Sequence, residues 1–322
     1  MGQIETVLIT GAAGFIGRAT VVAARLAGLK VVAVTRRDIP EAWQVDPGIT
    51  PLVCDLAAKD AQDRLASALP VDAVIHAAAH LGDDPARHEA ETLTATRNVL
   101  AAMPVDVPIV LVSSISVYDA MPLPAHAPLT EDSALQRVET ARDAYSAAKL
   151  QQEAICAASG HPVWMLRAGA VYGAGRTWHA HSGPSFGPVH MVIASDGEVP
   201  LTHVTHLANA LIAAAMADPD HAQPLNVVDD DLPTRLRFLA AHRKVGGWPK
   251  IVLPMPWRIW LGLSRLLKPV QSHLPGLLCE PTLRARVMPL TYPNARLRAV
   301  LGGADSAGFE QLMEHSIKGG RS

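Results

Sequence analysis

The chain is predicted to fold as an α/β protein with a doubly wound parallel sheet and a smaller C-terminal unit. In its first half, short apolar runs rich in β-branched residues alternate with segments of helical pattern. A glycine-rich turn separates the first apolar run from the first helical segment. Such alternation predicts right-handed strand–helix–strand units, with helices on both faces of a buried sheet.

Each expected element rests on this pattern. The expected strands cover residues 6–10, 30–35, 51–54, 73–76, 107–113, 162–166 and 224–228. The expected helices cover residues 15–27, 57–69, 86–103, 138–159, 202–217 and 232–242. Residues 176–188 are rich in glycine, proline and histidine and are expected to form a loop, and prolines and glycines divide residues 254–281 into short apolar helices.

The composition excludes several classes of protein. Hydrophobic residues make up 49% of the 322-residue chain, which argues against disorder. A formal net charge of −2 offers no basic footprint for nucleic acid. We find no secretory signal pattern and no run of about 18 apolar residues that predicts a membrane span. Cys54, Cys156 and Cys279 lie far apart, as is typical of a reducing compartment, so we expect a cytoplasmic protein.

A glycine triplet marks the turn after the first expected strand. Gly11, Gly14 and Gly17 stand at three-residue intervals, and Phe15 and Ile16 open the helical pattern. Glycine permits a tight turn and a close approach of a ligand to the backbone. The helix that begins there offers unpaired N–H groups and a positive dipole end to a phosphate. We therefore predict a dinucleotide-binding domain over residues 1–170 and a mainly substrate-binding region over residues 171–322. In an alternative division, the strand expected near residues 224–228 belongs to the sheet of the first domain.

A second pattern indicates proton chemistry. Tyr145 and Lys149 are spaced i and i+4 in an expected helix, so their side chains lie on one face. A phenol has a pKa of about 10, and a nearby cation favours the phenolate and lowers that pKa. Ser114 follows the buried strand over residues 107–113, where a site on this sheet needs a hydrogen-bond donor. The alternatives are a surface aromatic–cation pair and a serine that only caps the strand end.

Six motifs follow one another along the chain. They are Thr10-Gly11-x-x-Gly14-x-x-Gly17, Asp55-Leu56, His76-Ala77-Ala78-Ala79, Ser113-Ser114-x-x-Val117-Tyr118, Tyr145-x-x-x-Lys149 and Leu166-Arg167-Ala168-Gly169-Ala170-Val171-Tyr172-Gly173. In this order they resemble the extended short-chain dehydrogenase/reductases, the NAD(P)-dependent epimerase/dehydratase group. The resemblance covers residues 4 to about 230 well and the remainder weakly. It implies a Rossmann domain with a bound nicotinamide cofactor.

The resemblance also implies roles for single residues. Tyr145 would act as acid and base, Lys149 would lower its pKa and hold the ribose hydroxyls, and Ser114 would hydrogen-bond the reacting oxygen. The other cofactor contacts implied by the motifs are Gly11, Gly14, Phe15, Ile16, Gly17, Asp55, Leu56, Ala77, Ala78, Ala79 and Val171. The same resemblance suggests a homodimer built from the helices over residues 86–103 and 138–159.

The end of the second expected strand bears on the choice of cofactor. Thr35 stands where members that prefer NAD have an aspartate, and Arg36 and Arg37 follow it. A carboxylate there suits a free 2′-hydroxyl, whereas guanidinium groups match a 2′-phosphate. The sequence therefore favours NADP. In the alternative, both arginines are solvated and Asp38 supplies the carboxylate for NAD.

Several positions depart from the pattern of the nucleotide-sugar members. Ala170 replaces the asparagine that meets the sugar nucleotide's phosphates, and Val199 replaces an arginine. Thr205 and His206 replace two aspartates, and Thr92 replaces a helix asparagine. A diphosphate without its arginine loses a charge-assisted contact worth about 1.5–3 kcal/mol. A full nucleotide-sugar pocket is therefore in doubt, whereas the tyrosine–lysine pair is not.

Three histidines raise the question of a metal. His179 and His181 have the spacing of a loop metal site, and His190 is close in sequence, but no acidic residue or cysteine sits at ligand spacing. We favour a polar cleft lining or a surface loop and predict no metal.

The segment over residues 255–268 is apolar on one face, with Arg258, Arg265 and Lys268 interspersed. It is consistent with an interfacial membrane helix or a lid over an apolar substrate. We favour a third interpretation, a helix of the smaller unit packed on the sheet.

Together these patterns predict an NAD(P)-dependent oxidoreductase that acts on a small molecule. Hydride transfer would occur at a carbonyl or secondary alcohol, with Tyr145 as acid and base. The alternative is a nucleotide-sugar epimerase or dehydratase with tightly bound NAD. A non-catalytic dinucleotide sensor is a third hypothesis, but such a protein would have no need of Tyr145 and Lys149.

Overall fold

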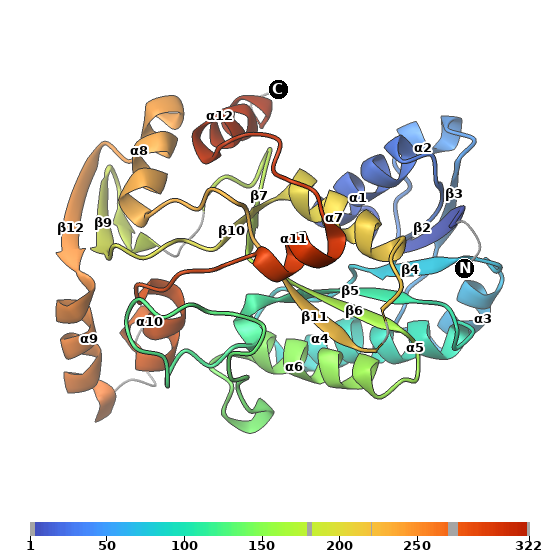
Figure 1. Ribbon diagram of the computed structural model, residues 1–322, viewed down its shortest axis with the longest axis horizontal. Helices are drawn as coiled ribbons and strands as arrows, with labels where there is room; N and C mark the ends of the chain where they lie inside the picture. Colours follow the sequence, from blue (N-terminus) through green and yellow to red (C-terminus); the bar gives the residue numbers. More distant parts are fainter. Residues whose placement is uncertain (1–3, 179–181, 220, 270–275, 321–322) are drawn as a thin grey trace.

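A seven-stranded parallel sheet forms the centre of the protein, as the sequence predicts. The computed structural model describes residues 4–178, 182–219, 221–269 and 276–320 (Figure 1). The strands lie in the order β11-β6-β5-β4-β1-β2-β3. Their bounds are β1 Thr6–Thr10, β2 Lys30–Thr35, β3 Ile49–Val53, β4 Ala73–His76, β5 Ile109–Ser114, β6 Val163–Ala168 and β11 Gln223–Val227. The order reverses between β1 and β4, and open sheets of this kind bind ligands at such a point, beyond the carboxyl ends of the strands.

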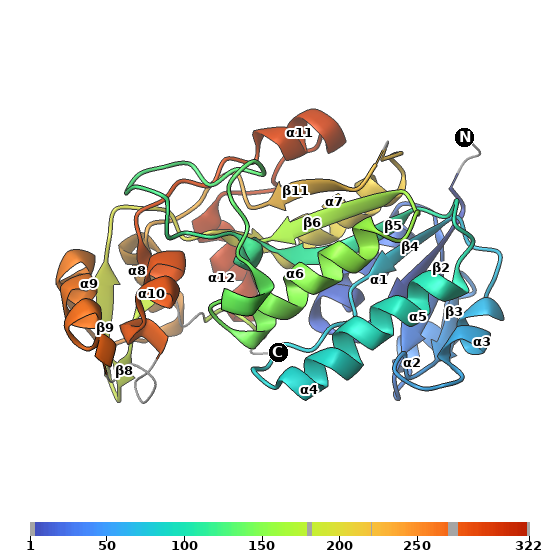
Figure 2. The same cartoon turned by 90° about the horizontal axis from the view of Figure 1, so that it is seen from below.

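Helices cover both faces of this sheet (Figures 1 and 2). One face packs against α1 and α7, and the other packs against α3, α5 and α6. The bounds are α1 Phe15–Leu26, α2 Glu41–Val45, α3 Ala61–Ala66, α5 Ala95–Ala102, α6 Ala144–Ala157 and α7 Val204–Ala215. Residues 201–227 thus return to the large sheet after the chain has left it, since α7 covers one face and β11 forms an edge.

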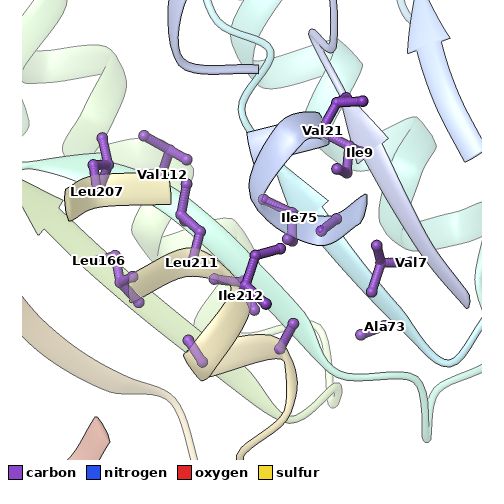
Figure 3. Packing of buried hydrophobic residues seen from close by; sticks show 14 of the residues in the cluster. Val7, Ile9, Val21, Ala73, Ile75, Val112, Leu166, Leu207, Leu211 and Ile212 are labelled. Carbon is purple, nitrogen blue, oxygen red and sulfur yellow. The ribbon is translucent and has the colours of Figure 1, made fainter. Parts of the chain in front are cut away.

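Alternate residues of the central strands enter two separate cores. Val7 and Ile9 of β1 pack on the side of α1 and α7, whereas Leu8 packs on the opposite side. Figure 3 shows that Val21 of α1 and Leu211 of α7 lie on the side of the sheet to which Val7 and Ile9 point. Because both faces are covered, every one of these positions must be apolar, which explains the uninterrupted runs in the sequence.

The helix expected over residues 138–159 begins later than predicted. Residues 138–140 form a 3-10 turn, and α6 starts at Ala144. The carboxylate of Asp143 accepts a hydrogen bond from the Ser146 backbone N–H at 2.7 Å, so Asp143 is the N-cap. Arg142 therefore lies outside the helix, in the segment that leads to Tyr145.

The helix expected over residues 86–103 is not uniform. It consists of α4 (Pro85–His88), a π-helical turn (Glu89–Thr94) and α5. Turns of this kind are frequent beside functional sites, and Glu91 of this turn lines the smaller of the two cavities described below.

Two further helices differ from the prediction. The helix expected over residues 57–69 is limited to α3, and the one expected from residue 202 is preceded by the short strand β10 (Leu201–His203). β10 pairs in parallel with β7 (Ala170–Tyr172), which the sequence pattern did not reveal.

The smaller unit contains a second sheet that the sequence analysis missed. Its order is β12-β9-β8, formed by β8 (Ser185–Phe186), β9 (Val189–Ala194) and β12 (Ile251–Pro256). Because of Pro254 and Pro256, the sequence pattern did not predict β12 as a strand. β12 lies at the edge of its sheet, where proline is tolerated. The helices of this region are α8 Arg235–Gly246, α9 Trp257–Leu266, α10 Glu280–Val287, α11 Ala295–Leu301 and α12 Phe309–Gly319.

The apolar segment over residues 255–268 forms the end of β12 and then α9. Leu261 of α9 is buried against Ile193, Leu283 and Val287, so the helix packs on the smaller unit. Its opposite side remains open, and Leu266 is 77% exposed. Within the described ranges, no helix is long and apolar enough to cross a membrane.

Candidate active site

A cavity of about 730 Å³ opens at the carboxyl ends of the central strands. Its walls come from the turn after β1, the ends of β4, β5 and β6, the start of α6, and the end of α10 with the segment that follows it. The large sheet and the smaller unit therefore both contribute to one site, as the topology predicts. Its size is typical of a small-molecule or cofactor site.

The glycine turn forms the floor of this cavity. Gly11 has a φ of +62°, and a Cβ there would lie 2.9 Å from the backbone nitrogen of Ala78. A Cβ on Gly17 would lie 2.2 Å from the carbonyl oxygen of Gly11. Both positions therefore need glycine, one for its backbone conformation and the other for close packing of α1 on β1. Gly14 caps α1, and the first turn of that helix lines the cavity. A helix N-terminus in such a position favours binding of a phosphate.

The other residues predicted to bind the cofactor divide between two cavities. The larger cavity is lined by Phe15, Ile16, Ala77, Ala78, Ala79, Val171 and Lys149, together with the three glycines of the turn. A neighbouring cavity of about 180 Å³ is lined by Asp55 and Leu56, and it shares Thr35 and Arg36 with the larger one. Arg37 and Asp38 line neither cavity.

The residues present fit a nicotinamide dinucleotide. Thr35 and Ser116 each place a buried hydroxyl in the wall of the larger cavity, and neither oxygen has a hydrogen-bond partner within the described chain. A buried polar atom without a partner is costly, so hydroxyls in this position favour a polar ligand. The cradle left by the glycines fits a pyrophosphate in the same cavity.

Tyr145 and Ser114 lie together in the wall of the larger cavity. Burial raises the pKa of the Tyr145 phenol above 10, and the interaction with the Ser114 hydroxyl only partly offsets this effect. Lys149 is not among the groups that shift this pKa here, so the lowering expected from Lys149 stays a prediction. The Nζ atom of Lys149 is 6.0 Å from the centre of the Tyr145 ring, and it is engaged elsewhere.

Lys149 is held by a buried chain of hydrogen bonds. Its Nζ donates to the carbonyl oxygen of Val112 at 2.8 Å and to Oε1 of Gln152 at 2.9 Å. The amide nitrogen of Gln152 donates to Oγ1 of Thr96, which itself donates to a backbone carbonyl. Burial lowers the pKa of Lys149 to about 8. The lysine is thus fixed in place before any ligand contacts it.

The same chain defines the protonation of His76. Thr96 uses its hydroxyl hydrogen on the Thr92 carbonyl at 2.6 Å, so His76 must donate from Nε2 to Thr96. Its Nδ1 then accepts from Thr10, whose oxygen also accepts from the Ala78 N–H at 3.2 Å. This tautomer is neutral, in agreement with a pKa lowered by burial to about 3. The network connects the lysine to the cofactor-facing end of β4.

A second buried network supports the strands below the site. Arg167 binds both carboxylate oxygens of Glu153, at 2.9 and 2.7 Å, and Ser113 donates to the same carboxylate at 2.5 Å. Arg167 also donates to the hydroxyl of Tyr118, which donates in turn to Asn226. The pair fixes β5, β6 and α6 relative to one another.

Three arginines in the cavity wall were missed by the sequence analysis. They are Arg142, Arg176 and Arg286. The guanidinium of Arg176 lies over the ring of Phe15, 5.1 Å from its centre. Arg142 had a local signal, since it lies three residues before Tyr145, whereas Arg286 reaches the site only through the fold.

Of the three histidines considered as metal ligands, only His190 belongs to the part of the chain that the structure describes. His179 and His181 lie outside the described residues. His190 is buried, with Nδ1 at 2.8 Å from Oγ of Ser185 and its ring 5.3 Å from that of Trp178. A different group, His206 with Asp229 and Asp305, has ligand atoms within 4.8 Å of one another, but the imidazole is hydrogen-bonded to Asp229 at 2.9 Å and forms an ion-pair network.

Comparison with known proteins finds one related sequence and two solved structures of similar fold, among others. L-xylulose reductase of Mus musculus is 43% identical over 75 residues, which is 22% of this chain and 31% of that protein, so the chain matches about a third of this relative's length. The solved structure of MoeE5 in complex with UDP-glucuronic acid and NAD has a TM-score of 0.70 at 22% identity, covering 98% of this chain and 99% of that one. UDP-glucose 4-epimerase from Bifidobacterium longum, solved with NAD+ and UDP, has a TM-score of 0.70 at 19% identity, covering 98% of each chain.

These structural likenesses concern the fold. The family model of the NAD dependent epimerase/dehydratase family, in contrast, matches residues 7–227, from the first strand of the sheet to the last. That range contains the glycine turn, Tyr145 and Lys149. The chain is therefore an enzyme of the NAD-dependent epimerase/dehydratase family, with a nicotinamide dinucleotide as its cofactor.

Proposed function

We propose that this enzyme reduces a carbonyl group of a small molecule, or oxidises the corresponding secondary alcohol, with Tyr145 as the proton donor and acceptor. The observation that carries the proposal is the Tyr145 phenol, which lies beside Ser114 in the cavity wall with its pKa raised by burial. A phenol with a raised pKa is protonated at neutral pH, so it is ready to donate to the oxygen of a carbonyl that is being reduced.

In this proposal each residue has one task. Ser114 holds the reacting oxygen by a hydrogen bond, and Tyr145 donates its phenolic proton to that oxygen. Lys149, fixed by Val112 and Gln152, holds the ribose hydroxyls. The bound nicotinamide supplies the hydride chemistry, which is a property of the cofactor rather than of the protein. In the oxidative direction the alcohol returns its proton to Tyr145.

The nucleotide-sugar alternative is less well supported by the substrate side of the cavity. Val199, which replaces the arginine of the sugar-nucleotide pattern, is buried in the core of the smaller unit and does not line the cavity. Ala170 lines the cavity but offers no polar side chain. Thr92 is buried and accepts a hydrogen bond from the His80 backbone N–H at 3.0 Å. A diphosphate would therefore lack the partners expected from that pattern.

We also propose that Arg36 directs the enzyme toward NADP. Of Arg36 and Arg37, only Arg36 lines the cavities, and its side chain is 48% exposed. It pairs with Glu91 at 3.3 Å, and Glu91 also pairs with Arg87 at 2.9 Å. Tighter binding of NADP(H) than NAD(H), lost in Arg36→Ala, is the expected result of titration. Tighter binding of NAD(H) than of NADP(H) by the parent protein would contradict this proposal.

The reaction type is tested by following the absorbance of added NADH or NADPH with a panel of small carbonyl compounds. A reductase consumes the added cofactor stoichiometrically with product. The nucleotide-sugar alternative predicts conversion of a sugar nucleotide by the purified enzyme with no net absorbance change, because the cofactor is regenerated in each cycle. We further propose a homodimer through α5 and α6, to be tested by light scattering coupled to size exclusion.

A further inference from the structure

The cavity wall beside Tyr145 contains two arginines from distant parts of the sequence. Arg142 precedes α6, and Arg286 belongs to the last turn of α10. Both line the same cavity as Tyr145 and Ser114. Neither arginine stands at a position of the nucleotide-sugar pattern described above, where the corresponding residues are Ala170 and Val199.

The charges of this cluster are only partly balanced. The Asp143 carboxylate accepts from the Ser146 backbone N–H at 2.7 Å and from Nε of Arg142 at 3.3 Å. No other acid is paired with Arg142, whose side chain is 12% exposed, and the Arg286 guanidinium has no hydrogen bond or ion pair with any residue that the structure describes. Two guanidinium groups thus face one carboxylate in a largely buried place. An additional anion there would gain charge-assisted hydrogen bonds.

The remaining charged groups of the cavity are accounted for elsewhere. Arg36 pairs with Glu91, Arg176 lies over Phe15 beside the glycine turn, and Lys149 is bound by Val112 and Gln152. Asp83 is an exposed residue of the wall. Arg142 and Arg286 are thus the two cations of the wall that lie near Asp143, beside the proton donor, and this single carboxylate balances their charges only in part.

The end of α10 is fixed in a way that suits a binding site. The guanidinium of Arg235 is buried and donates to the backbone carbonyl of Arg286. It also donates to Oγ of Ser195 at 2.7 Å, and that hydroxyl donates to the carbonyl of Val287 at 2.9 Å. The backbone that bears Arg286 is thus held from two sides, which reduces the entropy lost when its side chain binds a ligand.

We propose that Arg142 and Arg286 form an anion-binding subsite, and that the substrate has a carboxylate or phosphate group close to the carbon that is reduced or oxidised. The two planar forks match the oxygens of either group. Burial lowers the pKa of Arg142, and the charge of Asp143 raises it. The positive charge of Arg286 lowers this pKa further, as expected for two neighbouring cations with one carboxylate between them. This inference depends on the proposed function only in treating the cavity as the substrate site.

Anion binding to the cofactor-loaded protein tests the subsite without any turnover. The probes are acetate, malonate and inorganic phosphate, titrated with calorimetry or ligand-observed NMR. We expect saturable binding that weakens about 10- to 100-fold in Arg142→Gln and in Arg286→Gln. Arg284→Gln is the matched control, because Arg284 lies on the same helix, pairs with Glu280 at 2.9 Å and does not line the cavity.

Each outcome has a defined meaning. Tighter binding of the carboxylates than of phosphate supports an oxo or hydroxy acid as substrate, and the reverse order supports a phosphate ester. No saturable binding in the parent protein, or equal weakening in Arg284→Gln, would overturn the subsite. As a second readout, a keto acid and its methyl ester are compared as substrates, and Arg286→Gln should raise KM for the acid only. Absence of carbonyl reduction with intact anion binding would refute the reductase proposal and leave the subsite supported.

Discussion

The close packing of α1 on β1 predicts a large effect for Gly17→Ala. The added Cβ would lie 2.2 Å from the Gly11 carbonyl oxygen and 2.7 Å from the Cα and carbonyl oxygen of Ala12. These are backbone atoms, so no side chain can move aside, and α1 must shift by about 1 Å to restore ordinary contact. Overpacking of this kind costs about 1–3 kcal/mol.

The shift should lower both stability and cofactor affinity. Because about 1 kcal/mol corresponds to roughly 2–4 °C in large domains, we expect Tm to fall by about 2–12 °C. The displaced N–H groups at the start of α1 should weaken NAD(P)H binding by about 10-fold or more. Thermal unfolding and fluorescence titration of the cofactor measure the two effects.

Gly262→Ala provides the matched control. Gly262 also lies within a helix, but a Cβ there would meet open space. Replacing a helical glycine by alanine is expected to stabilise the protein by about 0.5–1 kcal/mol, with no change in cofactor affinity. A Gly17→Ala protein with the Tm and cofactor affinity of the parent would refute the interpretation of the turn as a close-packed cradle.

Three further predictions concern the interior. Glu153→Ala leaves Arg167 buried without its carboxylate and should cost about 3–5 kcal/mol of unfolding free energy in denaturant melts, whereas a cost below about 1 kcal/mol would contradict the role of this pair. Gln152→Leu removes one of the two acceptors of Lys149 and should lower the free energy of unfolding by about 1–3 kcal/mol. Gln152→Glu keeps an acceptor and should retain most of the stability. Equal losses in both variants would contradict the role of Gln152 as an acceptor for Lys149. Burial is the largest single influence on the pKa of His206 and lowers it, but the hydrogen bond to Asp229 and the charges of Asp229 and Asp305 together outweigh burial, so the net shift is upward. The stabilisation is then complete below the unfolded-state pKa of about 6.5 and is lost as pH rises through the higher folded-state pKa. The stability deficit of His206→Gln relative to the parent should therefore shrink as pH rises above about 6.5, and a constant deficit would contradict the sign.

Local signals predicted the parts of the protein that local sequence determines. The strand, glycine turn and helix over residues 6–26 follow from contiguous apolar residues and from the glycines of the turn, of which Gly11 and Gly17 have no space for a side chain. The spacing of Tyr145 and Lys149 correctly predicted that both line the same cavity. The partners of Lys149 were not predictable in this way, because Val112 lies 37 residues away and only the sheet brings it close.

The substrate side was harder to predict for the same reason. Arg286 reaches the cavity because the chain returns to the site more than a hundred residues after Tyr145, and no pattern in α10 marks that position. The strands β9 and β12 were missed because prolines and glycines beside β9 and within β12 resemble loop signals. β12 tolerates its prolines because it lies at the edge of its sheet. Tertiary contacts, not local propensity, decide both cases.

The most direct test of the proposed chemistry compares Tyr145→Phe with the parent enzyme on the same carbonyl substrate. Removing the proton donor should lower the rate of cofactor-dependent reduction by about 10²- to 10⁴-fold. Cofactor affinity should remain within about twofold, since Lys149 keeps its contacts with Val112 and Gln152. Reduction at the parent rate by Tyr145→Phe, with cofactor binding intact, would contradict the assignment of Tyr145 as the proton donor.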